Sequence, residues 1–171
     1  MLFRDDCGDA LPLFVYGTLR PGQPNYAAYL RGHTRHEEAA RLEGINLYTL
    51  FNYPLAVRGE RVLIGDVLTL DPRLYCDLLA EIDALEGYDP AESDRLFTRE
   101  VCTVTTESGQ VVRAWFYLGN PAYLDQLDHT LIEHGDWVRF HEERMRQARQ
   151  AGRRQDLPPG QDAAKSSPNP H

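Results

Sequence analysis

Glu86 is the residue whose type and position best suit acid–base chemistry. It lies near the end of DPRLYCDLLAEIDALEGYD, residues 71–89, a stretch with the apolar spacing of an amphipathic helix. At about 100° per residue, Glu86 falls inside the sector that also holds the apolar Leu78 and Ile82. A carboxylate that faces a core must be paired, protonated or placed at the wall of a cavity, because an unpaired buried charge is costly. Burial would also raise the pKa of Glu86, as a general base that works near neutrality requires.

The same position has a second interpretation that involves no chemistry. Helix ends commonly differ from their expected position by a residue or two, and a helix that frays before Gly87 would leave Glu86 in solvent. The helix pattern alone leaves both interpretations open. The other acidic residues of the helix are predicted to lie outside the apolar sector: Asp77, Asp83 and, just beyond its edge, Glu81.

A second candidate site is the stretch FVYGTLRPG, residues 14–22. The apolar run from Leu11 to Tyr16 predicts a strand that is covered on both faces. The run stops at Gly17, where the backbone can approach a ligand closely, and Thr18 then offers a hydroxyl group. Taken alone, this stretch is either a strand that ends in a loop or a turn whose N–H groups hold a small anion.

Runs of apolar and β-branched residues predict the strands that carry these sites. The expected strands are Leu11–Tyr16, Ala39–Leu50, Arg61–Leu70, Arg99–Thr106 and Val111–Leu118. Gly44 and Gly65 are expected to mark bulges or close approaches of the backbone. NYPLAVRG, residues 52–59, is predicted to be a loop because Pro54 and Gly59 interrupt it.

Two internal helices complete the predicted domain. A short helix over residues 26–30 would be capped by Asn25. The helix that carries Glu86 would begin at Asp71 with Pro72 in its first position, and would end at Gly87. Short strands bury most surface when they curl into a barrel, so the predicted fold class is α+β with a small β-barrel.

The last part of the chain differs in composition from the rest. Residues 137–150 predict a charged helix that docks on the domain by its first turns. Residues 152–171 contain four prolines and almost no apolar side chains, so they are predicted to form a disordered tail. One domain over residues 1–151 is therefore expected.

Composition limits the classes of partner. The formal net charge is −8 and no dense block of lysine or arginine is present, which argues against a nucleic-acid partner. The first residues, MLFRDDCGDA, lack the features of a secretory signal, and no apolar stretch is long enough to span a bilayer. A cytoplasmic protein with a small-molecule partner and no membrane partner is the expectation, and the oligomeric state stays open.

Cysteine and histidine usage predicts neither a disulfide framework nor a metal. Cys7, Cys76 and Cys102 are odd in number and show no CxxC spacing, so reduced thiols are expected. The histidine pairs that could suggest a metal belong to no recognisable ligand set: His33 with His36, and His129 with His134. No metal is therefore expected, and the sequence offers no convincing site for an organic cofactor either.

The order of several motifs resembles that of a known family. FVYGTLRPG is followed by NYPLAVRG, by DALEGYD at residues 83–89 and by WFYLG. This combination resembles the γ-glutamylcyclotransferase-like family, which includes the AIG2-like proteins and the γ-glutamylamine cyclotransferases, over roughly residues 12–120. HGDWVRF at residues 134–140 also looks like a stretch that some AIG2-like members carry after the last strand. The resemblance implies a small mixed five-stranded β-barrel with flanking helices and a cavity at its mouth.

The resemblance also implies roles for the residues of both sites. In members of known activity, the tyrosine–glycine turn binds the α-carboxylate of a γ-glutamyl group, and the glutamate that matches Glu86 is the acid/base. The backbone N–H groups of Gly17, Thr18 and Leu19 would then hold that carboxylate, with the phenol of Tyr16 near the ligand. A plain turn at the end of a strand is the other interpretation of Gly17.

Two aromatic positions bear on the substrate. Tyr117 resembles a family tyrosine that lines the cavity, and an ordinary core aromatic is its other interpretation. Phe97 stands where many members place a tyrosine before an arginine. The missing phenol removes one hydrogen-bond donor, which leaves open the identity of the substrate rather than the core reaction.

The implied activity is cyclisation of a γ-glutamyl amine or amide to 5-oxoproline, with release of the free amine. The α-amino group of such a substrate is its own nucleophile, so the enzyme must hold a pose and move protons. Two alternatives stay open: removal of a γ-glutamyl protecting group from a biosynthetic intermediate, and non-catalytic binding of a small acid on the same barrel.

Overall fold

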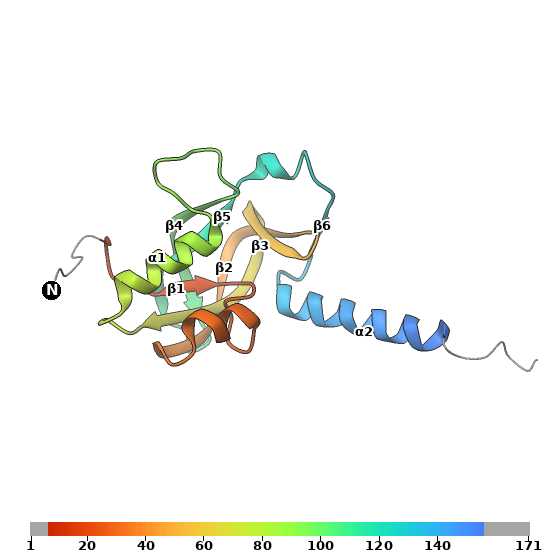
Figure 1. The fold of residues 1–171 in the computed structure, drawn as a ribbon, viewed down its shortest axis with the longest axis horizontal. Coiled ribbons are helices and arrows are strands. Elements are labelled where there is room, and N and C mark those ends of the chain that lie inside the picture. The colour runs from red at the N-terminus through yellow and green to blue at the C-terminus, as the bar shows by residue number, and fades with distance from the viewer. Residues whose placement is uncertain (1–6, 156–171) are drawn as a thin grey trace, which may run out of the picture. The chain divides into compact units, whose positions relative to one another are not determined.

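The computed structural model describes residues 7–155, and its centre is a closed, mixed five-stranded β-barrel. The strands are β1 (Leu13–Val15), β2 (Thr34–Leu50), β3 (Tyr53–Leu70), β4 (Phe97–Thr106) and β5 (Val111–Gly119). They lie in the order β3-β1-β5-β4-β2, and pairing of β2 with β3 closes the barrel. β1 runs parallel to β5, while the other pairs are antiparallel (Figure 1). The predicted fold class is confirmed.

The hairpin of β2 and β3 is longer than predicted. Residues 52–59 were expected to form a loop, but all except Asn52 belong to β3, and the turn lies at Phe51 and Asn52. The prediction was wrong because the residues after Pro54 are buried: Leu55, Ala56 and Val57. Their burial outweighs the local preference of proline and glycine for loops. A sixth strand, β6 (His129–Leu131), pairs with the end of β2 and was not predicted.

Two glycines in this hairpin behave as predicted. Gly44 has a φ of 79° and lies where the register between β2 and β3 shifts. At Gly65 the backbone of β1 comes so close that an added Cβ would lie 2.3 Å from the carbonyl oxygen of Val15. Glycine is therefore required at Gly65 by the packing of β3 against β1.

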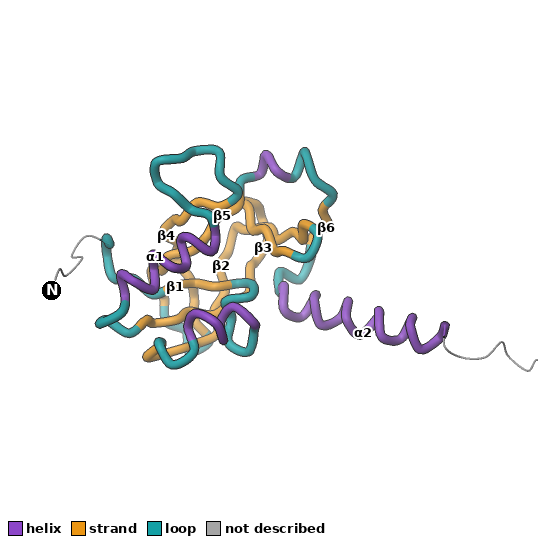
Figure 2. The backbone as a smooth tube through the Cα atoms, viewed as in Figure 1, coloured by secondary structure: helices purple, strands orange, loops and turns teal. Residues whose placement is uncertain are grey.

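Helix α1 (Tyr75–Glu86) packs along the barrel beside β1 (Figure 1). Leu79 and Ile82 are fully buried there, in one apolar cluster with Leu13 of β1. The helix begins later than predicted, because the Asp71 side chain accepts a hydrogen bond from the backbone N–H of Arg73 in a turn that precedes α1. The chain from α1 to β4 is a long loop (Figure 2).

Two short helical segments connect the strands. The first, η1 (Tyr26–Leu30), is a π-helix, and the second, η2 (Pro121–Tyr123), is a 3-10 helix. Asn25 occupies the N-cap position of η1, but its side chain caps no backbone group. Its amide nitrogen donates instead to the hydroxyl oxygen of Thr18, at 2.7 Å.

Helix α2 (Trp137–Gln155) docks by its first turn, as predicted. Trp137 is buried in the barrel core, and Val138 and Phe140 pack against that core. The chain divides into two compact units between Phe140 and His141, and the described part of the second unit is the rest of α2. Residues 152–155, which were assigned to the disordered tail, are helical, and the rest of that predicted tail lies outside the described residues. The predicted domain boundary at residue 151 stays a prediction.

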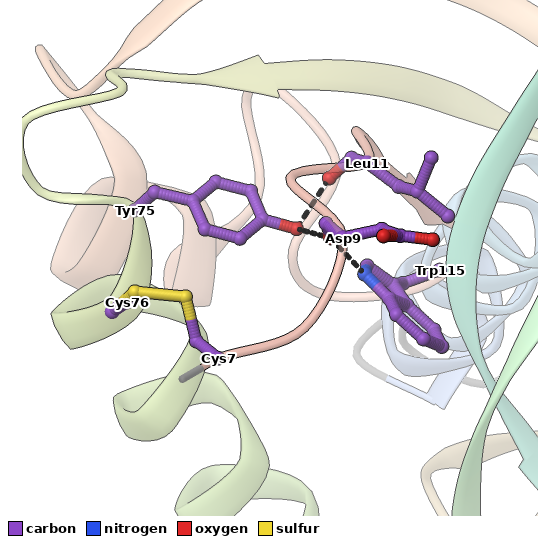
Figure 3. The surroundings of a disulfide bond; sticks show 6 residues. All are labelled: Cys7, Asp9, Leu11, Tyr75, Cys76 and Trp115. Atoms are coloured by element: carbon purple, nitrogen blue, oxygen red, sulfur yellow. Dashed lines mark hydrogen bonds between the residues drawn. A yellow bond between two sulfur atoms is a disulfide. The ribbon is translucent and has the colours of Figure 1, made fainter. Parts of the chain in front are cut away.

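The expectation of reduced thiols is wrong for two of the cysteines. Cys7 and Cys76 form a disulfide that ties the segment before β1 to the start of α1 (Figure 3), while Cys102 is free and buried. The partners are 69 residues apart in the sequence. Their pairing depends on two distant segments lying side by side, which no local spacing of cysteines reveals.

Hydrogen bonds hold the segment next to the disulfide. The hydroxyl of Tyr75 donates to the carbonyl oxygens of Leu11, at 2.7 Å, and Asp9, at 3.1 Å (Figure 3). The indole N–H of Trp115 also donates to the carbonyl of Asp9, at 3.2 Å. None of the helices within residues 7–155 is both long and apolar enough to cross a membrane.

Candidate active site

A cavity of about 380 Å³ brings the two predicted sites together. Its walls come from the turn after β1, the end of α1, the first residues of β3 and β4, and β5. All six predicted site residues line it: Tyr16, Gly17, Thr18, Leu19, Glu86 and Tyr117. The barrel therefore places the turn and the Glu86 carboxylate at the wall of one cavity, although about seventy residues separate them in the sequence. We call this space the Glu86 cavity.

Glu86 is the last residue of α1 and lies inside the helix rather than beyond a frayed end. Gly87 follows in the left-handed conformation, with a φ of 67°, and its N–H closes the helix on the carbonyls of Ala84 and Asp83. Burial raises the pKa of the Glu86 carboxyl to about 7. Within residues 7–155 no ion pair or hydrogen bond to this carboxylate is found. A carboxyl with such a pKa can both take and return a proton near neutrality.

The turn after β1 is held in place by its own backbone. The N–H of Arg20 donates to the carbonyl of Gly17 at 3.1 Å, and the N–H of Tyr26 donates to the carbonyl of Thr18 at 3.0 Å. The N–H groups of Gly17, Thr18 and Leu19 donate to no acceptor in the described part of the chain. These donors belong to residues that line the Glu86 cavity, and successive N–H groups of a turn are suited to an anion.

Gly17 is required by packing as well as by the turn. A Cβ at this position would lie 2.6 Å from the Cγ atom of Pro54 on β3. Pro54 belongs to the part of β3 that was predicted to be a loop. This part of β3 thus packs directly against the turn. The Thr18 hydroxyl already accepts a hydrogen bond from Asn25, so it keeps its own proton to donate.

The two tyrosines direct their hydroxyl groups to protein partners. Tyr16 donates to the carbonyl oxygen of Tyr117 at 2.6 Å, and Tyr117 donates to the Asp83 carboxylate at 2.7 Å. Burial, together with the negative charge of Glu86, raises the pKa of Tyr16 well above its usual value. The Tyr16 hydroxyl thus donates to a backbone carbonyl of β5, and both tyrosines line the Glu86 cavity. That the Tyr16 phenol lies near a ligand stays a prediction.

Comparisons with known proteins decide the family. A family model described as "Gamma-glutamyl cyclotransferase, AIG2-like" matches residues 13–139. The chain belongs to this family. The resemblance drawn from the motifs is confirmed, and the chain is a γ-glutamylcyclotransferase-like enzyme.

Three relatives illustrate the family. A gamma-L-glutamyl-butirosin B gamma-glutamyl cyclotransferase from Niallia circulans is 30% identical over 147 residues, which is 85% of each chain. A gamma-glutamylaminecyclotransferase from Bos taurus is 46% identical over 56 residues, 33% of this chain and 31% of its own. The solution structure of the Escherichia coli protein ytfP is 27% identical, has a TM-score of 0.51 and covers 75% of this chain and 96% of its own.

In this γ-glutamylcyclotransferase-like chain, a second cavity is lined in part by Asp83, which accepts the hydrogen bond from Tyr117, and sequence analysis did not predict it. It has a volume of about 580 Å³ and is lined by Asp83, Arg99, Trp115 and the disulfide. The guanidinium carbon of Arg99 lies 4.7 Å from the centre of the Trp115 ring, and Arg99 Nε is 3.5 Å from Asp83 Oδ1. We call this space the Arg99 cavity.

Asp83 was predicted to lie outside the apolar sector of α1, and it is half-buried instead. Burial raises the pKa of its carboxyl, while the hydrogen bond from Tyr117 and the charge of Arg99 oppose that rise. On the wheel Asp83 lies about 40° beyond Leu79, outside the apolar sector, so the helix pattern gave no signal of its burial. The helix buries a wider arc than its apolar residues indicate because β4 and β5 also face it.

No metal-binding group emerges among residues 7–155: no set of three or more histidine, cysteine, aspartate or glutamate side chains is placed to hold an ion. The described lining of the Glu86 cavity offers one carboxylate, hydroxyl groups and backbone amides. The chemistry that these groups can perform is anion binding and proton transfer.

Proposed function

We propose that this enzyme cyclises a γ-glutamyl amine or amide to 5-oxoproline and releases the free amine, with Glu86 as the general acid/base. The observation that carries the proposal is that one cavity holds both a carboxyl with a pKa of about 7 and a turn with N–H groups that have no described acceptor. The N–H groups of Gly17, Thr18 and Leu19 would bind the α-carboxylate of the substrate. Tyr16 and Tyr117 would form the walls that position it.

The proton transfers follow from the substrate. Its α-ammonium group loses one proton to solvent, and the amine nitrogen then attacks the γ-carbonyl carbon to close a five-membered ring. Glu86 takes the second proton as this C–N bond forms, and delivers it to the leaving nitrogen as the old C–N bond breaks. The ring-closing groups are in one molecule, so holding a single conformation accelerates the reaction without a covalent intermediate.

The cavity wall bears on the class of the leaving amine. Among the described residues that line the cavity, Glu86 is the only charged one. Most of the remaining wall near it is apolar or aromatic: Leu19, Tyr53, Pro54, Leu85, Leu96 and Phe97. A cationic amine would need acidic partners here, because an unpaired charge on an apolar wall is unfavourable. The wall therefore favours a γ-glutamyl derivative of a small, uncharged or apolar amine.

Removal of a protecting group is the second candidate, and one comparison supports it. The relative from Niallia circulans is named for a γ-glutamyl derivative of butirosin B, and it covers 85% of this chain. Both candidates share the chemistry and differ in the leaving amine. Non-catalytic binding of a small acid is the third candidate. It is the least favoured, because the Glu86 carboxyl has a pKa of about 7 and no counter-ion within the described part of the chain.

The deciding experiment is an assay of 5-oxoproline release from a panel of γ-glutamyl compounds. The panel contains γ-glutamyl derivatives of an alkylamine, a polycationic aminoglycoside and an amino acid, together with glutathione. Fastest release from the alkylamine derivative is expected, with a kcat that rises with pH through about 7 as Glu86 ionises. Fastest release from the aminoglycoside derivative would support the second candidate. Release from none of them, by a protein that binds 5-oxoproline, would support the third.

A further inference from the structure

Arg20 follows the Gly17–Leu19 turn, and two carboxylates from distant parts of the chain hold its side chain. Its Nε donates to Asp66 Oδ2 at 2.7 Å, and its Nη1 donates to Asp136 Oδ1 at 2.9 Å. The exposed fractions of the side chains of Arg20, Asp66 and Asp136 are 15%, 18% and 24%. Short, charge-assisted hydrogen bonds that are shielded from solvent hold geometry better than exposed ion pairs do.

Asp66 is fixed by the barrel itself. It lies on β3 opposite Val15, the last residue of β1, so it sits beside the point at which the turn begins. Val15 precedes the turn and Arg20 ends it. The Arg20–Asp66 pair therefore ties the far end of the turn back to its start.

Asp136 is fixed by the segment that follows β6. Its Oδ1 also accepts from the backbone N–H of Arg139, in the first turn of α2. The neighbouring Gly135 accepts from the N–H of Ile64 on β3 at 2.9 Å, and has a φ of 70°. A Cβ at Gly135 would lie 1.9 Å from the carbonyl oxygen of Val62, so only glycine allows this close approach to β3. HGDWVRF thus docks on the barrel in a way that presents Asp136 to Arg20.

Both the backbone and the side chain of Arg20 are consequently immobilised. Its N–H closes the turn on Gly17, and its guanidinium group reaches two anchored carboxylates. Neither Asp66 nor Asp136 belongs to the lining of the Glu86 cavity. Among the described residues, their carboxylates reach the turn through the side chain of Arg20.

We propose that Asp136 and Asp66 are positioning residues for the α-carboxylate site, which they keep in its binding geometry by holding Arg20. This inference rests on the proposed function, because it assumes that the turn binds a carboxylate. It assigns a purpose to HGDWVRF, the one sequence motif that the catalytic proposal leaves unused. It also explains how a segment more than a hundred residues from the turn contributes to substrate binding.

The test compares the binding of two ligands that differ only in whether they carry a carboxylate. 5-Oxoproline carries the carboxylate, and 5-oxoprolinamide carries a neutral carboxamide in its place. Asp136→Ala is expected to weaken the binding of 5-oxoproline about tenfold and to leave the binding of 5-oxoprolinamide within about twofold. KM for a γ-glutamyl substrate should rise about tenfold, while kcat changes by less than about threefold.

Two further variants control for a general loss of structure. Asp136→Asn keeps an oxygen that can accept from Arg20, so it should lie between the wild type and Asp136→Ala; it also replaces Asp136→Ala if that variant fails to fold. Glu100→Ala breaks the Arg58–Glu100 ion pair on another part of the barrel, and it should leave both ligands unaffected. Thermal unfolding of each variant gives its stability.

Three results would contradict the inference or its basis. Equal weakening of both ligands by Asp136→Ala would show that the residue supports the whole fold rather than the carboxylate site, and unchanged binding of 5-oxoproline would show that it supports neither. A wild-type protein that neither binds 5-oxoproline nor releases it from any γ-glutamyl compound would instead overturn the proposed function itself.

Discussion

Glu86 and Asp83 lie three residues apart on α1 and have different surroundings. Asp83 accepts a hydrogen bond from Tyr117 and lies 3.5 Å from Arg99, whereas Glu86 has no recorded partner in the described part of the chain. Burial raises the pKa of both carboxyls, but only at Asp83 do a hydrogen bond and a positive charge oppose the rise. Asp83 is therefore a structural acid, held by its partners, whereas Glu86 on the same helix is the acid that can exchange a proton near neutrality.

The two cavities differ in size and in the partners of the acid that lines each of them. The Arg99 cavity, at about 580 Å³, is larger than the Glu86 cavity, at about 380 Å³. Its Asp83 carboxylate accepts from Tyr117 and pairs with Arg99, whereas Nε and Nη1 of Arg99 are buried with no hydrogen-bond partner among the described residues. The disulfide lines one side of this cavity. The smaller cavity holds Glu86 and the N–H groups of the Gly17–Leu19 turn, for which residues 7–155 supply no partner. Size alone therefore does not identify the reactive site, because the acid whose pKa is raised by burial with no described partner to oppose the rise lies in the smaller cavity.

The largest effect is expected from Glu86→Gln, which should lower kcat by about 10²- to 10⁴-fold because it removes the group that moves the proton. Asp83→Asn is the matched control, since it makes the same chemical change on the same helix. That control should stay within about tenfold of the wild-type kcat, as expected for a group outside the reaction. Rates of 5-oxoproline release test both variants. A Glu86→Gln variant that folds normally and reacts at the wild-type rate would remove Glu86 from the mechanism.

Next in size is the loss of the disulfide beside the Arg99 cavity. Cys7→Ser should lower the free energy of unfolding by about 2–4 kcal/mol, because the cross-link restricts the unfolded chain across a long loop. Urea titrations with and without reductant measure the effect, and the wild type under reductant should match the variant. kcat should be unchanged, since the Glu86 cavity does not include the disulfide. Equal stability of oxidised and reduced wild type would contradict the expectation.

The pH dependence of stability should separate the two acids further. Folding raises the pKa of Glu86 from 4.5 to about 7, so the folded state holds this proton more tightly. The contribution of Glu86 to stability is therefore complete below about pH 4.5 and is lost as the pH rises through about 7. At about pH 8 the buried charge costs up to about 3 kcal/mol.

Glu86→Gln removes this cost. Relative to the wild type, the variant should gain stability as the pH rises from about 5 to about 8, as measured by chemical unfolding at each pH. Above about pH 7, where Glu86 is charged in the folded wild type, the variant would thus be the less active and the more stable form. A difference in unfolding free energy that does not change with pH would mean that Glu86 ionises in the folded protein as it does in the unfolded chain.

The smallest effect is expected from Tyr117→Phe. The variant loses the hydrogen bond to Asp83 and should be destabilised by about 1 kcal/mol. Because that bond opposes the upward shift, the pKa of Asp83 should rise further, which NMR titration can follow. kcat should fall by less than about tenfold, since the ring still forms the cavity wall. A loss of activity as large as that of Glu86→Gln would show that the Tyr117 hydroxyl takes part in the reaction.

Several features follow from local sequence patterns. The apolar wheel of residues 75–86 turned Glu86 inward, and Gly87 ended the helix in the left-handed conformation that glycine favours. Strands β4 and β5 lay within two residues of their predicted ends. These features depend on periodicity and on the preferences of single residues, which are written in short stretches of sequence.

Other features were decided only by the tertiary structure. The disulfide, the Asp83–Arg99 pair and the Arg20–Asp136 contact each join segments that are far apart in the sequence, and local propensity contains no information about them. The early part of β3 was predicted to be a loop because Pro54 and Gly59 interrupt it. In the structure it is a strand, because burial in the closed barrel stabilises it. By itself the sequence determined which residues could act as a base and as an anion-binding turn. The closing of the barrel decided that they share one cavity. It also decided that Glu86, unlike Asp83, meets no partner among residues 7–155, because pairing depends on where distant side chains meet.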